Sequence, residues 1–276
     1  MKITAFVIFI CSSFISFGQG VKTYSGKYEN GKITYQYYEN NSYERIYHGT
    51  YVYSCERYID FFGDGYETIK GNFKHNFQDG MWEYSYKSND NEIKVYIKGG
   101  YKDGLMDGIW TKTITNLTKN TIVLKMTASF KDGKLIGDFS FVQFKDVVKG
   151  KFNENSHYNG RWSVKYSNDN NEPCEIIYDF NDGLLTFILD RNIATGEIIY
   201  KSNEINTEKF YEEYFCDNCG GRHNSIGYVY FITTRLLVND ISNSYSHNYG
   251  GFDDGSATFN YGLRKIKYST LKYEKK

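Results

Sequence analysis

The stretch that decides the fold is Gly99-Gly-Tyr-Lys-Asp-Gly-Leu-Met-Asp-Gly-Ile-Trp110. In it a small residue stands two positions before an aromatic residue, an Asp-Gly pair follows, and a later glycine stands two positions before a tryptophan. Asp-Gly pairs favour type I′ turns, whose central residues need positive φ and which join neighbouring antiparallel strands. The stretch therefore predicts a β-hairpin in which the small residue makes room for a tryptophan from a paired strand.

The pattern recurs along the chain. Its aromatic positions are 28, 29, 22 and 28 residues apart between Phe73 and Phe180. Residues after the turns alternate between aromatic and polar, as over 82–87, which predicts strands with one aromatic and one polar face. We call the fifteen repeated residues the aromatic seam: Gly71, Phe73, Gly80, Trp82, Gly99, Tyr101, Gly108, Trp110, Phe130, Gly137, Phe139, Gly150, Phe152, Gly160 and Trp162. Rings in such a row pack on one another across strands, or stack on a sugar or a protein partner; we expect the packing role.

Two other segments match the pattern in part. Residues 49–53, Gly-Thr-Tyr-Val-Tyr, suggest a degenerate earlier unit, in which Gly49 is the small residue and Tyr51 the first aromatic. A fifth unit begins at Tyr178 and then loses the pattern, because Phe187 and Leu189 replace its glycine and tryptophan. We therefore expect the repeat sheet to span residues 24–190.

The composition agrees with an all-β protein and excludes several classes of function. The 276 residues include 33 Lys+Arg and 33 Asp+Glu, aromatic residues make up 18%, and the mean hydropathy is −0.59. A net charge of zero provides no basic surface for nucleic acid or anionic lipid. Intrinsic disorder is excluded because disordered chains are poor in aromatic residues. We expect an elongated antiparallel β-hairpin repeat sheet that binds no nucleic acid.

The first residues have the features of an export signal. Lys2 precedes an apolar run over residues 3–17, and small residues around Gly18 form a cleavage site, so residues 1–18 are predicted to be a signal peptide. The run is shorter than the roughly 20 apolar residues that a membrane span needs. We expect a mature protein that begins near Gln19, has no transmembrane segment, and is periplasmic, exposed on the cell surface or secreted.

The units over residues 71–82 and 99–110 resemble MORN repeats, in the variant form of bacterial proteins of the YwqK antitoxin-like family. The resemblance covers residues 65–190 well and residues 24–64 weakly. It implies an elongated antiparallel sheet and a scaffold or interaction role. The spacings here are longer than the usual family unit, which implies lengthened hairpins with Asn-rich tips.

Residues 191–276 do not follow the repeat, and we expect a β-rich capping region or small module that closes one end of the sheet. This region contains Cys216 and Cys219, which an oxidising compartment favours as a disulfide, either with each other or crossed with Cys55 and Cys174. Zinc binding with His223, redox catalysis and free thiols are the alternatives.

We predict no catalytic residue, no metal ligand and no cofactor. The Gly-X-Ser-X-Gly, His-Glu-X-X-His and phosphate-loop motifs are missing from the sequence. His48, His75 and His157 are expected to be solvated. The leading hypothesis is an exported non-enzymatic protein whose sheet binds another protein or a cell-envelope component. The alternatives are an exported immunity or antitoxin-like protein, and an enzyme housed in residues 191–276.

Overall fold

The computed structural model describes residues 20–59, 62–182 and 184–203. The predicted signal peptide, Cys216, Cys219 and nearly all of the predicted capping region lie outside these residues. The division of the chain at residue 190 stays a prediction.

The described residues form fourteen strands in one sheet. The strands are β1 Lys22–Tyr28, β2 Gly31–Glu39, β3 Arg45–Ile59, β4 Gly63–Lys74, β5 Phe77–Ser88, β6 Ile93–Lys102, β7 Leu105–Asn116, β8 Thr121–Lys131, β9 Lys134–Gln143, β10 Asp146–Phe152, β11 Tyr158–Ser167, β12 Pro173–Asn181, β13 Leu184–Asn192 and β14 Ile198–Ser202.

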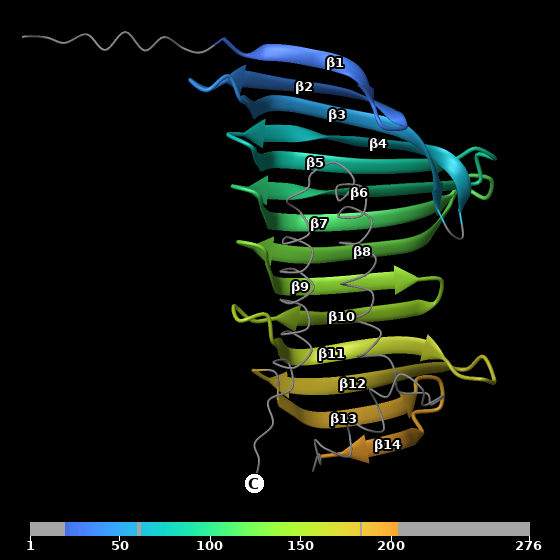
Figure 1. Cartoon of the computed structure of the whole chain (residues 1–276). Coiled ribbons are helices and arrows are strands. Elements are labelled where there is room, and N and C mark those ends of the chain that lie inside the picture. The colour runs from blue at the N-terminus through green and yellow to red at the C-terminus, as the bar shows by residue number, and fades with distance from the viewer. Residues whose placement is uncertain (1–19, 60–61, 183, 204–276) are drawn as a thin grey trace, which may run out of the picture.

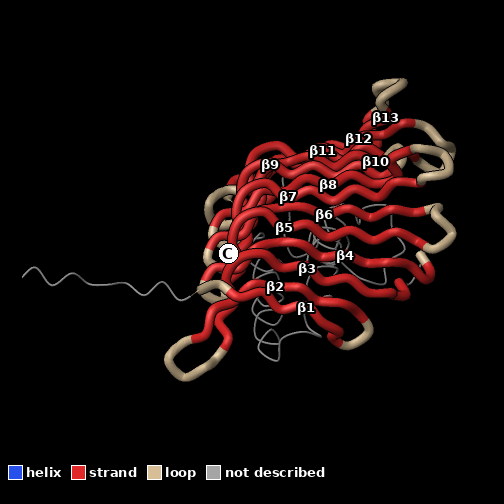
Figure 2. Tube along the Cα trace, turned by 90° about the horizontal axis from the view of Figure 1, so that it is seen from above, coloured by secondary structure: helices blue, strands red, loops and turns tan. Residues whose placement is uncertain are grey.

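Each strand pairs antiparallel with the next strand in the chain, so the spatial order equals the chain order. Figure 1 shows the strands stacked from β1 to β14, and Figure 2, a view from above, shows them as a single layer. The prediction of an all-β, elongated meander of hairpins is therefore confirmed. In the described part of the chain, no helix is long and apolar enough to cross a membrane.

The two faces of the sheet differ as the alternation of the sequence requires. Along β5, for example, Trp82, Tyr84 and Tyr86 are buried, while Glu83 and Ser85 between them are only partly buried. The buried rings of successive strands join into one continuous hydrophobic core on this face. We call it the core face, and the opposite one the outer face.

Two kinds of connection recur between the strands. In three of the two-residue turns, at 75–76, 103–104 and 132–133, both central residues have positive φ, as at Asp103 and Gly104 with φ of 50° and 81°. The five-residue loops 40–44, 153–157 and 168–172 share a different design, in which the Oδ1 of a leading asparagine accepts hydrogen bonds from the backbone N–H of the third and fifth residues. Side chains of this type stabilise turns because they replace backbone acceptors.

Candidate functional site

The aromatic seam forms the centre of the core face. Trp82, Trp110, Phe139 and Trp162 lie at equivalent places on β5, β7, β9 and β11, and none is more than 3% exposed. A Cβ atom added to Gly71, Gly99 or Gly150 would lie 1.9–2.1 Å from a ring carbon of the tryptophan on the next strand. In the third unit Ala128 faces Phe139 instead. The small residues thus leave the space that the rings fill.

The second glycine of each unit forms a bulge. Gly80, Gly108, Gly137 and Gly160 have φ between 64° and 81°, and at each of them the pairing with the preceding strand shifts register. Glycine adopts positive φ without a steric penalty, which explains its use here. The shift places extra residues on the outer face while the following ring stays on the core face.

Segment 49–53 proves to match a different part of the repeat from the one expected. Gly49 has a φ of 104° at a register shift between β2 and β3, and Tyr51 two residues later is 1% exposed. Gly49 is therefore the bulge glycine of an earlier unit, and Tyr51 takes the place of the tryptophan. The sequence showed the unit, but the 22 residues from Tyr51 to Phe73 equal the spacing from Phe130 to Phe152, which concealed which half of the unit was present.

Each tryptophan also donates a hydrogen bond to a backbone carbonyl group at the bulge that precedes it. The indole N–H groups of Trp82, Trp110 and Trp162 donate to the backbone carbonyl oxygens of Asn72, Gly100 and Lys151, over 3.1, 3.0 and 3.1 Å. These carbonyl groups belong to the residues directly after Gly71, Gly99 and Gly150, which we call the clearance glycines. The backbone ladder is interrupted at these positions. The indole thus supplies a donor at the interruption of the ladder, a structural role that a phenyl ring cannot fill.

Three of the four remaining seam rings pack edge-on against the tryptophans. Phe73, Tyr101 and Phe152 contact Trp82, Trp110 and Trp162 at centroid distances of 5.2, 5.1 and 5.0 Å with interplanar angles of 77–88°. Burial raises the pKa of the Tyr101 phenol above its ordinary value. Such edge-to-face contacts are the favoured geometry for aromatic pairs.

Buried carboxylates on the core face were not anticipated from the sequence. Glu67 is 1% exposed, and its Oε2 accepts hydrogen bonds from Arg57 at 2.7 Å and from the Tyr84 hydroxyl at 3.2 Å. Asp190 is equally buried and accepts from Tyr166 with both oxygens at 3.1 Å. Glu67 on β4 accepts from β3 and β5, and Asp190 on β13 accepts from β11, so both buried carboxylates have hydrogen-bond partners, as buried charges require.

The outer face carries an exposed group that we call the apolar quartet: Phe77, Met81, Leu105 and Ile109, which are 49–64% exposed. Phe77 and Leu105 begin β5 and β7, and Met81 and Ile109 follow the bulge glycines of the same strands. A Cβ atom on Gly104 would lie 3.1 Å from Phe77, so the Phe77 ring lies against the turn that leads into Leu105.

The same outer positions are charged in the next two hairpins. Asp138 and Arg161 stand between bulge glycine and ring, where Met81 and Ile109 stand earlier. Asp138 lies opposite Lys151 in the register of β9 and β10, and Arg161 forms two 2.9 Å hydrogen bonds to Asp179 on β12. In the quartet the paired positions hold small residues, because Met81 lies opposite Gly100 and Ile109 opposite Ser129.

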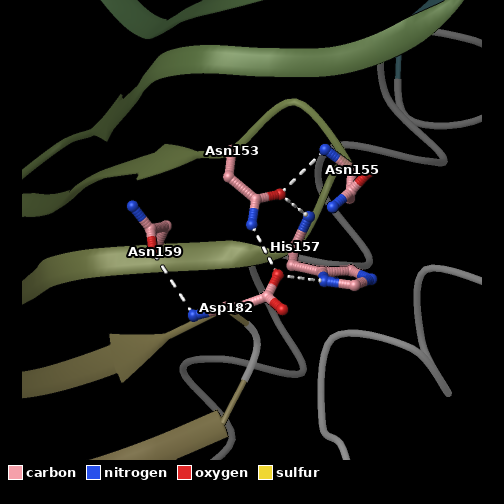
Figure 3. Close-up of polar contacts among 5 residues, drawn as sticks. All are labelled: Asn153, Asn155, His157, Asn159 and Asp182. Carbon is pink, nitrogen blue, oxygen red and sulfur yellow. Dashed lines mark hydrogen bonds and ion pairs between the residues drawn. The ribbon is translucent and has the colours of Figure 1, made fainter.

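A polar cluster joins two neighbouring loops at one edge of the sheet, as Figure 3 shows. The Oδ1 of Asp182 lies 2.8 Å from Nδ1 of His157 and accepts a 2.7 Å hydrogen bond from the Asn153 amide. The Asp182 backbone N–H donates to Oδ1 of Asn159 at 3.3 Å. The His157 side chain is only 13% exposed, so the expectation that it is solvated is wrong.

His157 and Asp182 form a pair in which the imidazole is oriented, because a carboxylate at Nδ1 fixes both the position of the ring and its tautomer. Acyl transfer would also need a nucleophile beside the ring. Among the described residues, no hydroxyl or thiol group forms a hydrogen bond with His157. The arrangement therefore works here as a link between the β10–β11 and β12–β13 loops.

The two described cysteines are buried and form no disulfide. Cys55 lies on β3 and Cys174 on β12, so they do not pair with each other. Burial raises the pKa of the Cys55 thiol, which disfavours the reactive thiolate form. No group of three or more His, Cys, Asp or Glu side chains that could hold a metal ion occurs in the described ranges. The predictions for Cys216 and Cys219 lie outside the described residues.

Comparisons with known proteins leave the chain without an assigned family. No family model matches it, and no curated protein matches it significantly. The resemblance to MORN repeats stays a prediction. The class that the described residues define is a single-layer antiparallel β-hairpin repeat protein.

Proposed function

We propose that this chain is an exported, non-enzymatic protein that binds another protein through the apolar quartet. The observation that carries the proposal is the exposure of Phe77, Met81, Leu105 and Ile109 on the outer face of two consecutive hairpins. Exposed apolar groups with polar surroundings are typical of protein interaction sites.

The fold itself does not require apolar residues at these positions. Asp138 and Arg161 occupy the sites of Met81 and Ile109 in later units, and the bulge and buried ring are retained there. Apolar side chains that stay about half exposed or more gain little from packing, so a role outside the fold explains the difference better than a structural one.

The surroundings of the quartet indicate the chemistry of the partner. Asp79 and Asp107 lie on the same strands between the apolar side chains, and β4 and β6 add Lys74 and Lys102 at their ends. An apolar centre bordered by charges of both signs is the usual composition of a protein interface, in which a few side chains provide most of the binding energy. The proposal therefore favours a protein over a charged polymer.

The test compares outer-face variants of the full chain. Met81→Asp combined with Ile109→Arg places the residues of the later hairpins on the quartet. A partner captured by the parent from envelope fractions would be identified by mass spectrometry, purified, and titrated against each protein. We expect the double variant to weaken binding by at least about 30-fold, the change that corresponds to a 2 kcal/mol hot spot, without a change in melting temperature.

A matched control changes the corresponding positions of the later hairpins, on β9 and β11. Asp138→Asn combined with Arg161→Gln should leave partner affinity as it is in the parent. Equal affinity of the parent and the quartet variant would contradict the proposal.

The export part of the proposal is supported by the leader-like residues 1–18 and is tested separately. N-terminal sequencing of the protein recovered from outside the cytoplasm should give a start near Gln19. A protein that keeps Met1 and stays in the cytoplasm would contradict export but not the binding surface.

A further inference from the structure

Two histidines that are 27 residues apart in the sequence lie side by side at one edge of the sheet. His48 is on β3 and His75 is in the turn between β4 and β5, and their ring centroids are 4.9 Å apart with an interplanar angle of 45°. Tyr38 on β2 lies edge-on to both rings, at 5.8 and 5.9 Å. The Tyr38 hydroxyl is 2.9 Å from Nδ1 of His75.

The turn that holds His75 departs from its sister turns. His75 and Asn76 have φ of 51° and 69°, the same left-handed backbone that Asp103-Gly104 and Asp132-Gly133 adopt in the next two hairpins. Asp-Gly is a favoured pair for this turn, whereas histidine, although it adopts positive φ more readily than most residues, is not one of its preferred residues. The choice of histidine is therefore explained by its neighbours rather than by the turn.

His48 has a nitrogen that the described residues leave without a partner. Its Nδ1 is inaccessible to solvent and forms no hydrogen bond with any described residue. Buried polar atoms are nearly always satisfied, so such a nitrogen needs a specific explanation.

We propose that His48 and His75 together bind a divalent transition-metal ion such as Zn²⁺. Neutral imidazole nitrogens are preferred ligands for zinc, copper and nickel. With Zn–N bonds of about 2.0–2.1 Å and tetrahedral geometry, two imidazoles on one ion have centroids roughly 5 Å apart, which matches the observed spacing. This site is independent of the apolar quartet.

Tyr38 has the role of an orienting partner. Ligating histidines typically use their second ring nitrogen for a hydrogen bond that fixes the ring and tautomer. The Tyr38 hydroxyl engages Nδ1 of His75, which leaves Nε2 of this ring for the ion. With two protein ligands, water completes the coordination, and the ion is exchangeable rather than structural.

The test is a calorimetric titration of the purified full chain with ZnCl₂ at neutral pH. We expect one ion per chain. His48→Gln should weaken binding at least tenfold. Converting the turn to Asn-Gly, by His75→Asn with Asn76→Gly, should do the same while it supplies a strong type I′ pair and no new carboxylate. Tyr38→Phe should weaken binding about 10–100-fold, as loss of an orienting group does.

Two controls separate this site from others in the chain. His157→Gln, which changes the imidazole bound to Asp182, should leave zinc affinity unchanged. Replacing Cys216 and Cys219 by serine should also leave it unchanged, and cobalt added in place of zinc should give no thiolate charge-transfer band. Zinc binding that survives the Asn-Gly turn, or that is lost only with the cysteines, would overturn the proposal, as would a parent chain that binds no zinc. If His48→Gln fails to fold, the turn variant decides the outcome.

Discussion

The hairpins of β4–β7 and those of β8–β11 share their core face and differ on their outer face. Both halves have the bulge glycine followed two residues later by a buried ring. Outside, the first half exposes Met81 and Ile109, whereas the second half has Asp138 and Arg161 with oppositely charged residues paired across the strand. Steric demands keep a bulge glycine and a buried ring on the core face of these units. The outer face is free of these demands, so we relate its differences to function.

A smaller difference exists within the core face itself. Three units combine a clearance glycine with tryptophan, and the third combines Ala128 with Phe139. Ala128 has one methyl group more than glycine, and the Phe139 ring is smaller than an indole. Phenylalanine also lacks the N–H group that donates to the bulge carbonyl in the other units. The two positions therefore change as a pair, as close-packed interiors require.

The largest effect is expected from removing a seam ring. Trp110→Ala should reduce the free energy of unfolding by about 3–5 kcal/mol, because it leaves a cavity and an unsatisfied carbonyl group at Gly100. Denaturant titration of the full chain measures this change. Trp110→Phe should cost less, and a Trp110→Ala variant as stable as the parent would show that the ring is not part of the core.

A double-mutant cycle sharpens the comparison between glycine–tryptophan and alanine–phenylalanine units. Gly99→Ala alone should destabilise by about 1–3 kcal/mol through overpacking, since the added Cβ would lie 2.0 Å from the Trp110 ring. Combined with Trp110→Phe, which imitates Ala128 and Phe139, its cost should fall. Additive effects of the two substitutions would contradict the paired relation.

The bulge gives a third, smaller effect. Gly108 has a φ of 81° and open space where a Cβ would be placed, so Gly108→Ala adds only backbone strain. We expect a loss of about 1–2 kcal/mol, the cost of the left-handed conformation in a residue with a side chain. Gly108→Asn should lose less, because asparagine tolerates this conformation, and an alanine variant that matches the parent would indicate that the bulge can relax.

The smallest effect concerns the charged half alone. The hydrogen bonds from Arg161 hold the pKa of Asp179 below its ordinary value. The unfolded chain has the ordinary value, so the stabilisation is present above about pH 4 and is lost as the pH falls through the folded-state pKa. Arg161→Ile, which copies Ile109, should make unfolding less sensitive to acid in this range. Identical pH profiles for both proteins would show that the pair contributes nothing.

The sequence was sufficient for the fold because the repeat reports steric requirements directly. Glycine two positions before an aromatic residue, and Asp-Gly in the turns, each correspond to a local geometry that few other residues allow. The Gly49–Tyr51 unit was placed wrongly because the 22 residues from Tyr51 to Phe73 match one of the spacings of the repeat. Glu67 was missed because its burial depends on Arg57 and Tyr84, which come from other strands. The pairing of His48 with His75 likewise depends on strand register, which no single segment contains.

The strand order has a consequence for how the protein folds. Each strand pairs only with its neighbours in the chain, so every backbone pairing closes a short loop, which is unusual for an all-β protein. Low contact order favours fast folding, and a linear array can nucleate at any hairpin and extend in both directions. Separating a central strand breaks two interfaces, whereas releasing β1 breaks one among the described strands. Amide hydrogen exchange should therefore be slowest near β7 and become faster stepwise towards β1, as in a zipper that opens from its end.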